Sequence, residues 1–401
     1  MITLPIGFFQ GNVVTPPSGM FTIGTGFAGL ARAMAFQTGD SKLVIGGNFT
    51  SYNGTLRNRI VRLFSGGTVD TSFTIGTGFN SDVYAIAIQS DGKIVVGGNF
   101  ITFNGISRPR IARLNSDGSL DNTFVVGTGF NAIVYTLAIQ SDGKILVGGT
   151  FINYNGTAQS GITRLNTDGT FDTTWNTGGT GFYSSQTVRG ISIQPSDGKI
   201  ICVGLMGAYD AISGDSGVRK IARLHPNGNF DTSFPTVPFG FNTGTNIVYQ
   251  TAFQSTNRLI TVGDFSSYKS AGRVGVVRIN QTNANNDNTF NVGFGGFGTP
   301  ISFSNTPTGC LVQPDDKIVV YGLFNSFDGV TVSGVVRLLA NGLIDATFNT
   351  GGAGFSVGKQ VLSGVLLPDG KIVLGGSFTT YNGLPRNNIV RLNSDGSDNT
   401  Q

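Results

Sequence analysis

The stretch SDGKIVVGGNF at residues 90–100 decides the fold, because variants of it recur along the whole of this 401-residue chain. Every copy carries a basic residue at the same place, and that residue returns about every 55 positions, a spacing typical of propeller blades. The basic residues are Lys42, Lys93, Lys144, Lys199, Arg258, Lys317 and Lys371. Most solenoid repeats are shorter than this. The sequence therefore predicts seven blades.

Two further markers follow the first one in each repeat. One is the arginine of a phrase like Arg-Leu-Asn, and its copies are Arg62, Arg113, Arg164, Arg223, Arg278, Arg337 and Arg391. The other is an Asp followed three residues later by an aromatic residue, as in Asp121 and Phe124. In the last repeat Asp398 has no aromatic residue after it, whereas the phrase expected there occurs at residues 21–27. We therefore predict that residues near Phe21 complete the last blade and close the ring, which removes an open sheet edge.

Within the second repeat, residues 83–88 predict a strand and Asp91-Gly92 a two-residue turn into a returning strand at 93–96. Residues 110–114 predict a third strand, and the segment 124–130 a fourth. The runs IVVGG and IARL are almost continuously apolar, which is typical of sheets covered on both faces. Glycine pairs end the returning strands, where we expect converging blades to leave no room for a side chain.

These patterns predict an all-β chain with two parts. Residues 21–401 form a seven-bladed β-propeller of four-stranded antiparallel blades, whose ring is closed by an N-terminal strand that joins the C-terminal blade. Residues 1–20 form an N-terminal arm or docking segment that precedes the closing strand, with a disordered tail as the alternative.

The phrases DGKIVVGGNF, RIARLNSDGSLDNTF and GTGFN resemble the delta-60 repeat family, a β-propeller repeat of bacteria and phages, and the glycine pairs also resemble kelch repeats. The resemblance covers residues 21–401. It implies the propeller fold and carries over no catalytic residues. Cellular members of this family resemble secreted or surface proteins with leaders or sorting domains, neither of which we identify here.

Composition excludes several classes of protein. Only 12% of the residues are charged and 31 are Phe, which excludes a disordered, solvating chain. The net charge is +4, but the basic residues sit at fixed places in the repeat and form no cluster that would follow phosphates, so we expect no nucleic-acid partner. No apolar run approaches the length needed to cross a bilayer, and the first basic residue is Arg32, so we expect neither membrane insertion nor a secretory leader.

The sequence offers little catalytic chemistry. His225 is the only histidine, and it stands where other repeats have a turn Asn. The Asp residues belong mostly to Asp-Gly turns or to the third marker, where binding of backbone N–H groups is favoured over calcium binding. We interpret the repeated arginine as a buried or half-buried partner of the third-marker Asp, in a bidentate pair. Cys202 and Cys310 lie in apolar strands and are interpreted as small buried hydrophobic residues. We therefore predict that the protein is not an enzyme and has no catalytic residues, no metal site and no cofactor.

Two features could form a binding surface. An aromatic residue precedes the second turn of every repeat, and because it recurs in all of them, packing is favoured over a sugar-binding rim: Tyr52, Phe103, Tyr154, Tyr209, Tyr268, Phe327 and Tyr381. Repeats four to six also contain irregular stretches, which either recognise a partner or have drifted neutrally. From these stretches we predict the binding residues Tyr209, Asp210, Asp215, Arg219, Lys220, Phe241, Asn246, Phe294 and Phe297.

The functional expectation is a non-enzymatic structural or binding module of a virus particle, such as a phage tail, fibre or capsid-associated protein. Its expected partners are other virion proteins in a multi-subunit assembly, and a host surface glycan or protein. The missing leader, the low charge and the family resemblance favour this setting. The alternatives are a secreted bacterial surface adhesin or a carbohydrate-binding propeller, which would place the protein outside the cell or at its surface.

Overall fold

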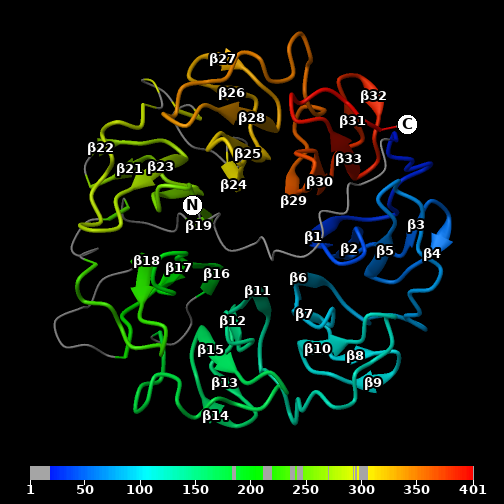
Figure 1. Cartoon of the computed structure of the whole chain (residues 1–401), viewed down its shortest axis with the longest axis vertical. Helices are drawn as coiled ribbons and strands as arrows, with labels where there is room; N and C mark the ends of the chain where they lie inside the picture. Colours follow the sequence, from blue (N-terminus) through cyan, green and yellow to red (C-terminus); the bar gives the residue numbers. More distant parts are fainter. Residues whose placement is uncertain are drawn as a thin grey trace.

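The computed structural model is a ring of seven antiparallel sheets around a central channel (Figure 1). It describes residues 19–182, 187–210, 219–234, 240–241, 247–269, 271–291, 293, 296–297 and 306–400, so nearly all of the predicted N-terminal arm at residues 1–20 lies outside the described residues. This part of the chain contains strands and turns and no helix that could span a membrane. The predicted all-β, seven-bladed propeller is confirmed.

Each blade begins with an inner strand that lines the channel. The inner strands are β1 (Ala31–Gln37), β6 (Val83–Ile88), β11 (Val134–Ile139), β16 (Thr187–Ile193), β19 (Val248–Phe253), β24 (Thr306–Val312) and β29 (Val361–Leu366). Each one pairs with a returning strand of the same blade: β2 (Lys42–Gly47), β7 (Ile94–Gly98), β12 (Ile145–Gly149), β17 (Ile200–Met206), β20 (Leu259–Gly263), β25 (Ile318–Leu323) and β30 (Ile372–Gly376).

The third strands pair on the outer side of the returning strands. They are β5 (Ile60–Leu63), β10 (Ile111–Leu114), β15 (Ile162–Leu165), β18 (Arg219–Leu224), β23 (Val276–Ile279), β28 (Val335–Leu338) and β33 (Ile389–Leu392). The returning and third strands are buried on both faces between neighbouring blades, which explains their continuous apolar sequences.

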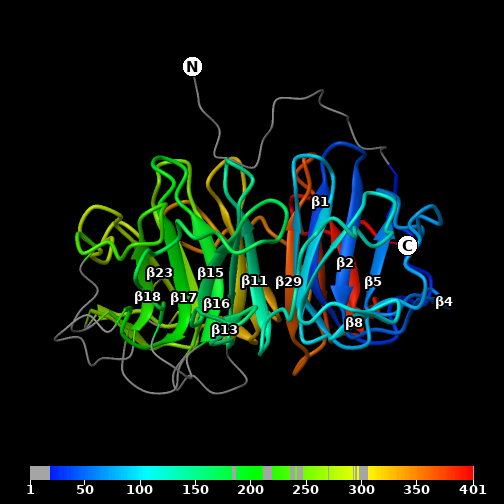
Figure 2. The same ribbon diagram turned by 90° about the horizontal axis from the view of Figure 1, so that it is seen from below.

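A short hairpin joins the returning strand to the third strand in six of the blades that the structure describes. The hairpins are β3–β4 (Ser51–Tyr52, Thr55–Leu56), β8–β9 (Thr102–Phe103, Ile106–Ser107), β13–β14 (Asn153–Tyr154, Thr157–Ala158), β21–β22 (Ser267–Tyr268, Ala271–Gly272), β26–β27 (Ser326–Phe327, Val330–Thr331) and β31–β32 (Thr380–Tyr381, Leu384–Pro385). In β8–β9, Asn104 and Gly105 both have positive φ, as the tightest hairpin turn requires. Strands β4, β8 and β13, each of which belongs to one of these hairpins, lie towards one rim of the propeller (Figure 2).

The fourth strand is shorter than the sequence predicts. In each blade the chain after the third strand makes only one bridged pair with it, such as Leu114 with Leu120. Residues 124–130 form turns, and Phe130 bridges to Tyr154 of the next blade. The Gly-rich phrase favours this outcome, because Gly127 and Gly129 both have positive φ, which a regular strand excludes. The segment therefore connects two blades and does not extend a sheet.

The two ends of the described chain close the ring, as predicted. The N–H of Phe21 donates to the carbonyl oxygen of Asn399 at 2.8 Å, and Phe21 forms a bridge with Thr400. Arg391 Nη1 donates to the carbonyl oxygen of Ser65 in the first blade at 2.6 Å. Strand β29 lies beside β1 in the same way as each earlier inner strand lies beside the next (Figure 1).

The paired glycines mark two close approaches. A Cβ on Gly97 would lie 2.5 Å from the Cγ1 of Val134 in the next blade, and one on Gly98 would lie 2.2 Å from the carbonyl oxygen of Asp82. The first glycine therefore lets two blades meet, as predicted. The second one lets the returning strand approach the chain just before the inner strand β6, where a bulge occurs.

Candidate functional site

The three sequence markers meet in one buried network in each of the first six blades. In the second blade, Asp121 Oδ2 lies 2.7 Å from Arg113 Nε and 3.0 Å from Lys93 Nζ. The other oxygen of Asp121 accepts hydrogen bonds from the N–H and hydroxyl of Thr123. The Arg113 guanidinium lies over the ring of Phe124 at 4.8 Å. The predicted Arg–Asp pairing is confirmed, but one carboxylate oxygen binds the arginine instead of two.

The same arginines connect neighbouring blades. Arg113 Nη1 donates to the carbonyl oxygen of Thr167 in the third blade and to Oε1 of Gln89. Every blade repeats the bond to the next one, through carbonyl oxygens of Ser116, Thr167, Pro226, Gln281, Ala340, Ser394 and, across the closure, Ser65. The network therefore holds the ring together at each blade boundary.

The network keeps its carboxylates ionised. Burial alone would raise the pKa of Asp70, but bonds from Ser72, Lys42 and Arg62 outweigh it and lower that pKa to about 2. Burial would also raise the pKa of Asp121, but hydrogen bonds from Thr123 and Lys93 hold it well below its usual range. These carboxylates therefore stay ionised near neutral pH, where they stabilise the fold and do not exchange protons.

The lowered pKa values predict a loss of stability in acid. A carboxylate whose pKa is lower in the folded state stabilises the fold above its unfolded-state pKa near 4, and this contribution is lost as the pH falls towards the folded value of about 2. For Asp70 the loss is about 2 kcal/mol. We expect urea unfolding, followed by the fluorescence of the only tryptophan, Trp175, to show falling midpoints from pH 5 to pH 2. Equal midpoints over that range would contradict the assignment.

The seventh blade departs from this pattern by one residue. Arg391 Nε donates to Oδ1 of Asn399 at 2.8 Å, and Asp398 instead bridges Leu392 and pairs with Arg386. Asn399 therefore occupies the place of the network Asp, and the sequence assignment of Asp398 to that place is corrected. The reason is that the last repeat lacks the apolar residue that Leu120 provides before Asp121 in the second.

Asn399 predicts a stabilising substitution. Asn399→Asp should raise the free energy of unfolding by about 1 kcal/mol, because the buried Arg391 would gain a charge-assisted hydrogen bond in place of a neutral one. Asp345→Asn in the sixth blade makes the reverse change and should destabilise the protein. Urea unfolding of both variants measures the effect, and a shift of the same sign in the two would contradict it.

The three described aromatic residues among the predicted binding residues are interior. Tyr209 is fully buried, and its hydroxyl donates to the carbonyl oxygen of Gly228 at 2.7 Å. Phe241 packs on Phe265, with ring centroids 4.6 Å apart. Phe297 is also fully buried. They occupy positions that the repeat fills with aromatic residues in every blade, so a partner cannot reach them in this structure.

The remaining predicted residues do not gather into one site among the described residues. Asp210 Oδ1 accepts hydrogen bonds from backbone N–H groups at positions 180 and 181, which is a turn role. Lys220 is buried in β18, and burial lowers the pKa of its amine against the opposing charge of Asp264. Asp215, Asn246, Phe294 and the side chain of Arg219 lie outside the described residues.

The structure confirms the roles predicted for the recurrent aromatic residues, for His225 and for the two cysteines. The recurrent aromatic residues before the second turn are all buried, so packing is their role. His225 occupies a turn, with its backbone N–H bonded to the carbonyl oxygen of Asn229. Cys202 and Cys310 are free and buried, and burial raises the pKa of the Cys310 thiol to about 12. The described residues contain no group of three His, Cys, Asp or Glu side chains that could hold a metal ion.

The candidate site lies in the central channel and was missed in the sequence. Every inner strand has a register shift against its returning strand, so each contributes one extra residue at a β-bulge. Bulges redirect side chains and are frequent beside functional sites. We call these seven residues the bulge ring: Arg32, Tyr84, Tyr135, Arg189, Tyr249, Thr308 and Leu362.

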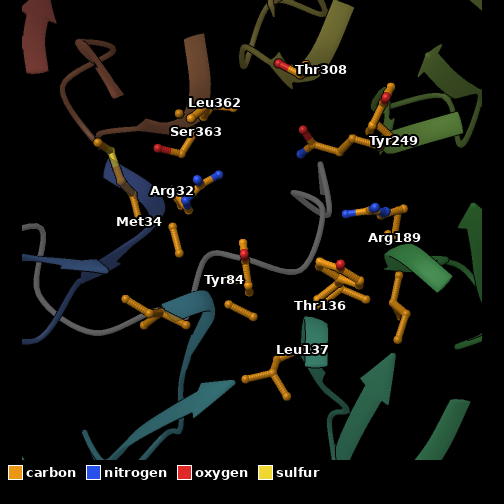
Figure 3. A pocket seen from close by; sticks show the side chains of 18 of the residues that line it. Arg32, Met34, Tyr84, Thr136, Leu137, Arg189, Tyr249, Thr308, Leu362 and Ser363 are labelled. Atoms are coloured by element: carbon orange, nitrogen blue, oxygen red, sulfur yellow. The ribbon is translucent and has the colours of Figure 1, made fainter. Parts of the chain in front are cut away.

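The bulge ring surrounds a cavity of about 430 Å³ (Figure 3). Arg32 Nε lies 3.4 Å from Oδ2 of Asp82, to which the Tyr84 hydroxyl donates at 3.2 Å. The rings of Tyr84 and Tyr135 are 5.2 Å apart, and the Arg189 guanidinium lies 3.8 Å from the centre of the Tyr135 ring. The first four blades thus place a continuous row of guanidinium and phenol groups along one side of the channel.

A model of the family described as "Domain of unknown function (DUF5122) beta-propeller" matches residues 38–73, 89–124, 140–174, 196–234, 254–290, 313–348 and 367–397. These segments make up more than half of the chain. The chain belongs to the DUF5122 β-propeller family. The DUF5122 segments contain the Lys, Arg and Asp of the network, whereas none of them includes an inner strand. The family model therefore covers the scaffold residues and leaves out the strands that carry the bulge ring.

One solved structure supports the fold of this DUF5122 propeller, and a second is similar to it at a lower score. The WD40 β-propeller domain of Doa1 matches with a TM-score of 0.53 at 12% identity, over 91% of this chain and 93% of that one. The C-terminal WD40 domain of Sif2 has a TM-score of 0.47 at 14% identity, over 94% and 85% of the two chains. No curated protein matches the sequence. At this identity the likeness to Doa1 shows the propeller fold alone.

Proposed function

We propose that this propeller is a non-catalytic structural and binding module of a virus particle, held in a multi-subunit assembly by the outer hairpins of four consecutive blades. The observation that carries the proposal is a set of exposed apolar side chains on the hairpins of blades six, seven, one and two. These side chains are Val330, Leu384, Leu56 and Ile106, with exposed fractions of 46%, 48%, 68% and 45%. One exposed apolar side chain on each of four neighbouring blades gives a partner protein a row of apolar groups to bury.

The network supports a structural role for the rest of the repeat. The carboxylates of Asp70 and Asp121 are buried, ionised and bonded to Arg, Lys and hydroxyl groups, so they cannot serve as general acids or bases near neutral pH. A ring tied at every blade boundary provides a rigid support on which rim residues can face a partner. The resemblance to a repeat of bacteria and phages is compatible with the virion setting, and a secreted adhesin stays the alternative.

Fractionation of infected cells tests the setting. We expect mass spectrometry to find the chain in purified particles in a fixed ratio to the other virion proteins. Recovery in the cell-envelope or medium fraction, with none in particles, would contradict the proposal and favour the adhesin.

Variants test the contact surface. Leu56→Ser with Ile106→Ser should reduce incorporation into particles about tenfold or more, because the contact loses two apolar side chains. Ile152→Ser in the third blade is the matched control, since this residue is also exposed, at 47%, but lies outside the four blades. Incorporation that is unchanged in the double variant, or equally reduced in the control, would contradict the proposed contact.

A further inference from the structure

We propose that the bulge ring binds an acidic sugar, whose carboxylate pairs with Arg189 and whose ring lies against Tyr249. The inference deepens the proposed function by assigning the class of ligand. It rests on that function only for the place where the protein would encounter the sugar. The channel residues are separate from the hairpin residues that carry the assembly contact. The two proposals can therefore fail separately.

Arg189 is a cation of the bulge ring for which the structure describes no anionic partner. Its guanidinium has no hydrogen bond or ion pair with any residue that the structure describes, and its Nε is shielded from solvent. The contact with Tyr135 holds the guanidinium in place without neutralising it. A guanidinium fixed in this way offers two parallel N–H donors that match a carboxylate. An anionic ligand would thus complete hydrogen bonds that the protein leaves open.

The charge balance of the cavity selects an anion. Arg32, the other cation of the bulge ring, is already paired with Asp82. Among the residues that the structure describes, the cavity lining includes both arginines and no Asp or Glu. Arg189 therefore contributes an uncompensated positive charge in a partly enclosed channel, where electrostatic attraction is stronger than at an open surface.

The remaining groups fit a sugar ring better than a small inorganic anion. Tyr249 enters the cavity from the blade after that of Arg189 (Figure 3), and the described residues include no aromatic or cationic group stacked on it. Phenol rings suit the C–H faces of sugars. The side-chain amide of Gln360 lines the cavity from the seventh blade and has no hydrogen-bond partner among the described residues, so it can bind sugar hydroxyl groups. A cavity of about 430 Å³ accommodates one such unit.

Calorimetric titration of the full chain with three probes tests the ligand class. D-Glucuronate carries both the ring and the carboxylate, methyl glucoside carries only the ring, and acetate carries only the carboxylate. We expect D-glucuronate to bind with a Kd of about 1 mM, at least tenfold more tightly than either other probe, and more weakly as salt is added. No measurable binding of D-glucuronate, or equal binding of acetate, would overturn the proposal.

Two variants locate the site. Arg189→Gln should weaken D-glucuronate binding about tenfold or more and abolish its salt dependence, and Tyr249→Leu should weaken it several-fold. Arg108→Gln makes the same charge change on an exposed hairpin, where the guanidinium bonds to Ser107 and Asn122, and should leave binding unchanged. Thermal unfolding confirms that each variant is folded. Equal losses for Arg189→Gln and Arg108→Gln would overturn the channel site, whatever the particle experiments show.

Discussion

Asp121→Ala should lower the free energy of unfolding by about 3–5 kcal/mol, one of the two largest effects expected in this protein. The substitution leaves the guanidinium of Arg113, which is only 5% exposed, without its carboxylate and next to the ammonium of Lys93. A buried charge deprived of its partner is more costly than the pair is favourable. Urea unfolding followed by Trp175 fluorescence measures the change.

Asp117→Ala is the matched control for this prediction. Asp117 lies in the same blade and accepts hydrogen bonds from Ser119, but it is exposed, so its loss should cost about 1 kcal/mol or less. Adding Arg113→Leu to Asp121→Ala should recover part of the stability, because it removes the unpaired charge. If Arg113→Leu instead lowers the stability of Asp121→Ala by as much as it lowers the stability of the unsubstituted protein, the ion-pair interpretation is wrong.

Phe21→Ala should cost about 3–5 kcal/mol and also open the ring. Its side chain is 1% exposed and lies under the guanidinium of Arg391, at 5.0 Å from ring centre to Cζ. Removing a buried phenylalanine ring leaves a cavity, and the free energy of unfolding falls by about this amount. At this position the same contact also holds the two ends of the described chain together, so we expect faster hydrogen exchange in β1 and β33 than in the middle blades.

Phe124→Ala separates packing from closure. Phe124 makes the equivalent contact with Arg113 at 4.8 Å, but the chain is continuous there, so a similar loss of stability should occur without selective exchange at the ends. Exchange that rises equally in all blades of Phe21→Ala, or equally in β1 and β33 of both variants, would contradict the role assigned to Phe21.

The repeat markers predicted the blades well because they report contacts within one repeat. Residues 83–88, predicted as a strand, are strand β6, and the third strand begins one residue after the predicted position. The pairing of Arg113 with Asp121 was likewise visible, since the two are close in sequence and recur together. The register of Asn399 was less visible, because one missing residue shifts the last motif, and only the bridge between Leu392 and Asp398 reveals the shift.

The candidate site was harder to predict. Position 32 and its equivalents are Arg, Tyr, Tyr, Arg, Tyr, Thr and Leu, a variation that could have marked a functional position inside an otherwise uniform strand. We instead predicted binding residues in the irregular stretches, and several of the aromatic residues there, such as Tyr209 and Phe297, are core residues. A bulge depends on how two strands pair, so a single-strand pattern does not show which side chains it redirects.

By itself, the sequence determined the seven blades, the first three strands of each blade and the closure of the ring, because hydrophobic pattern, turn glycines and the order of the repeats are local properties or follow from simple counting. Only the tertiary structure decided that the seven bulge residues face one channel and that no described residue there provides an anion for Arg189. These residues are separated by whole repeats, and closing the ring is what brings them together. Their charges balance, or fail to balance, only across blades.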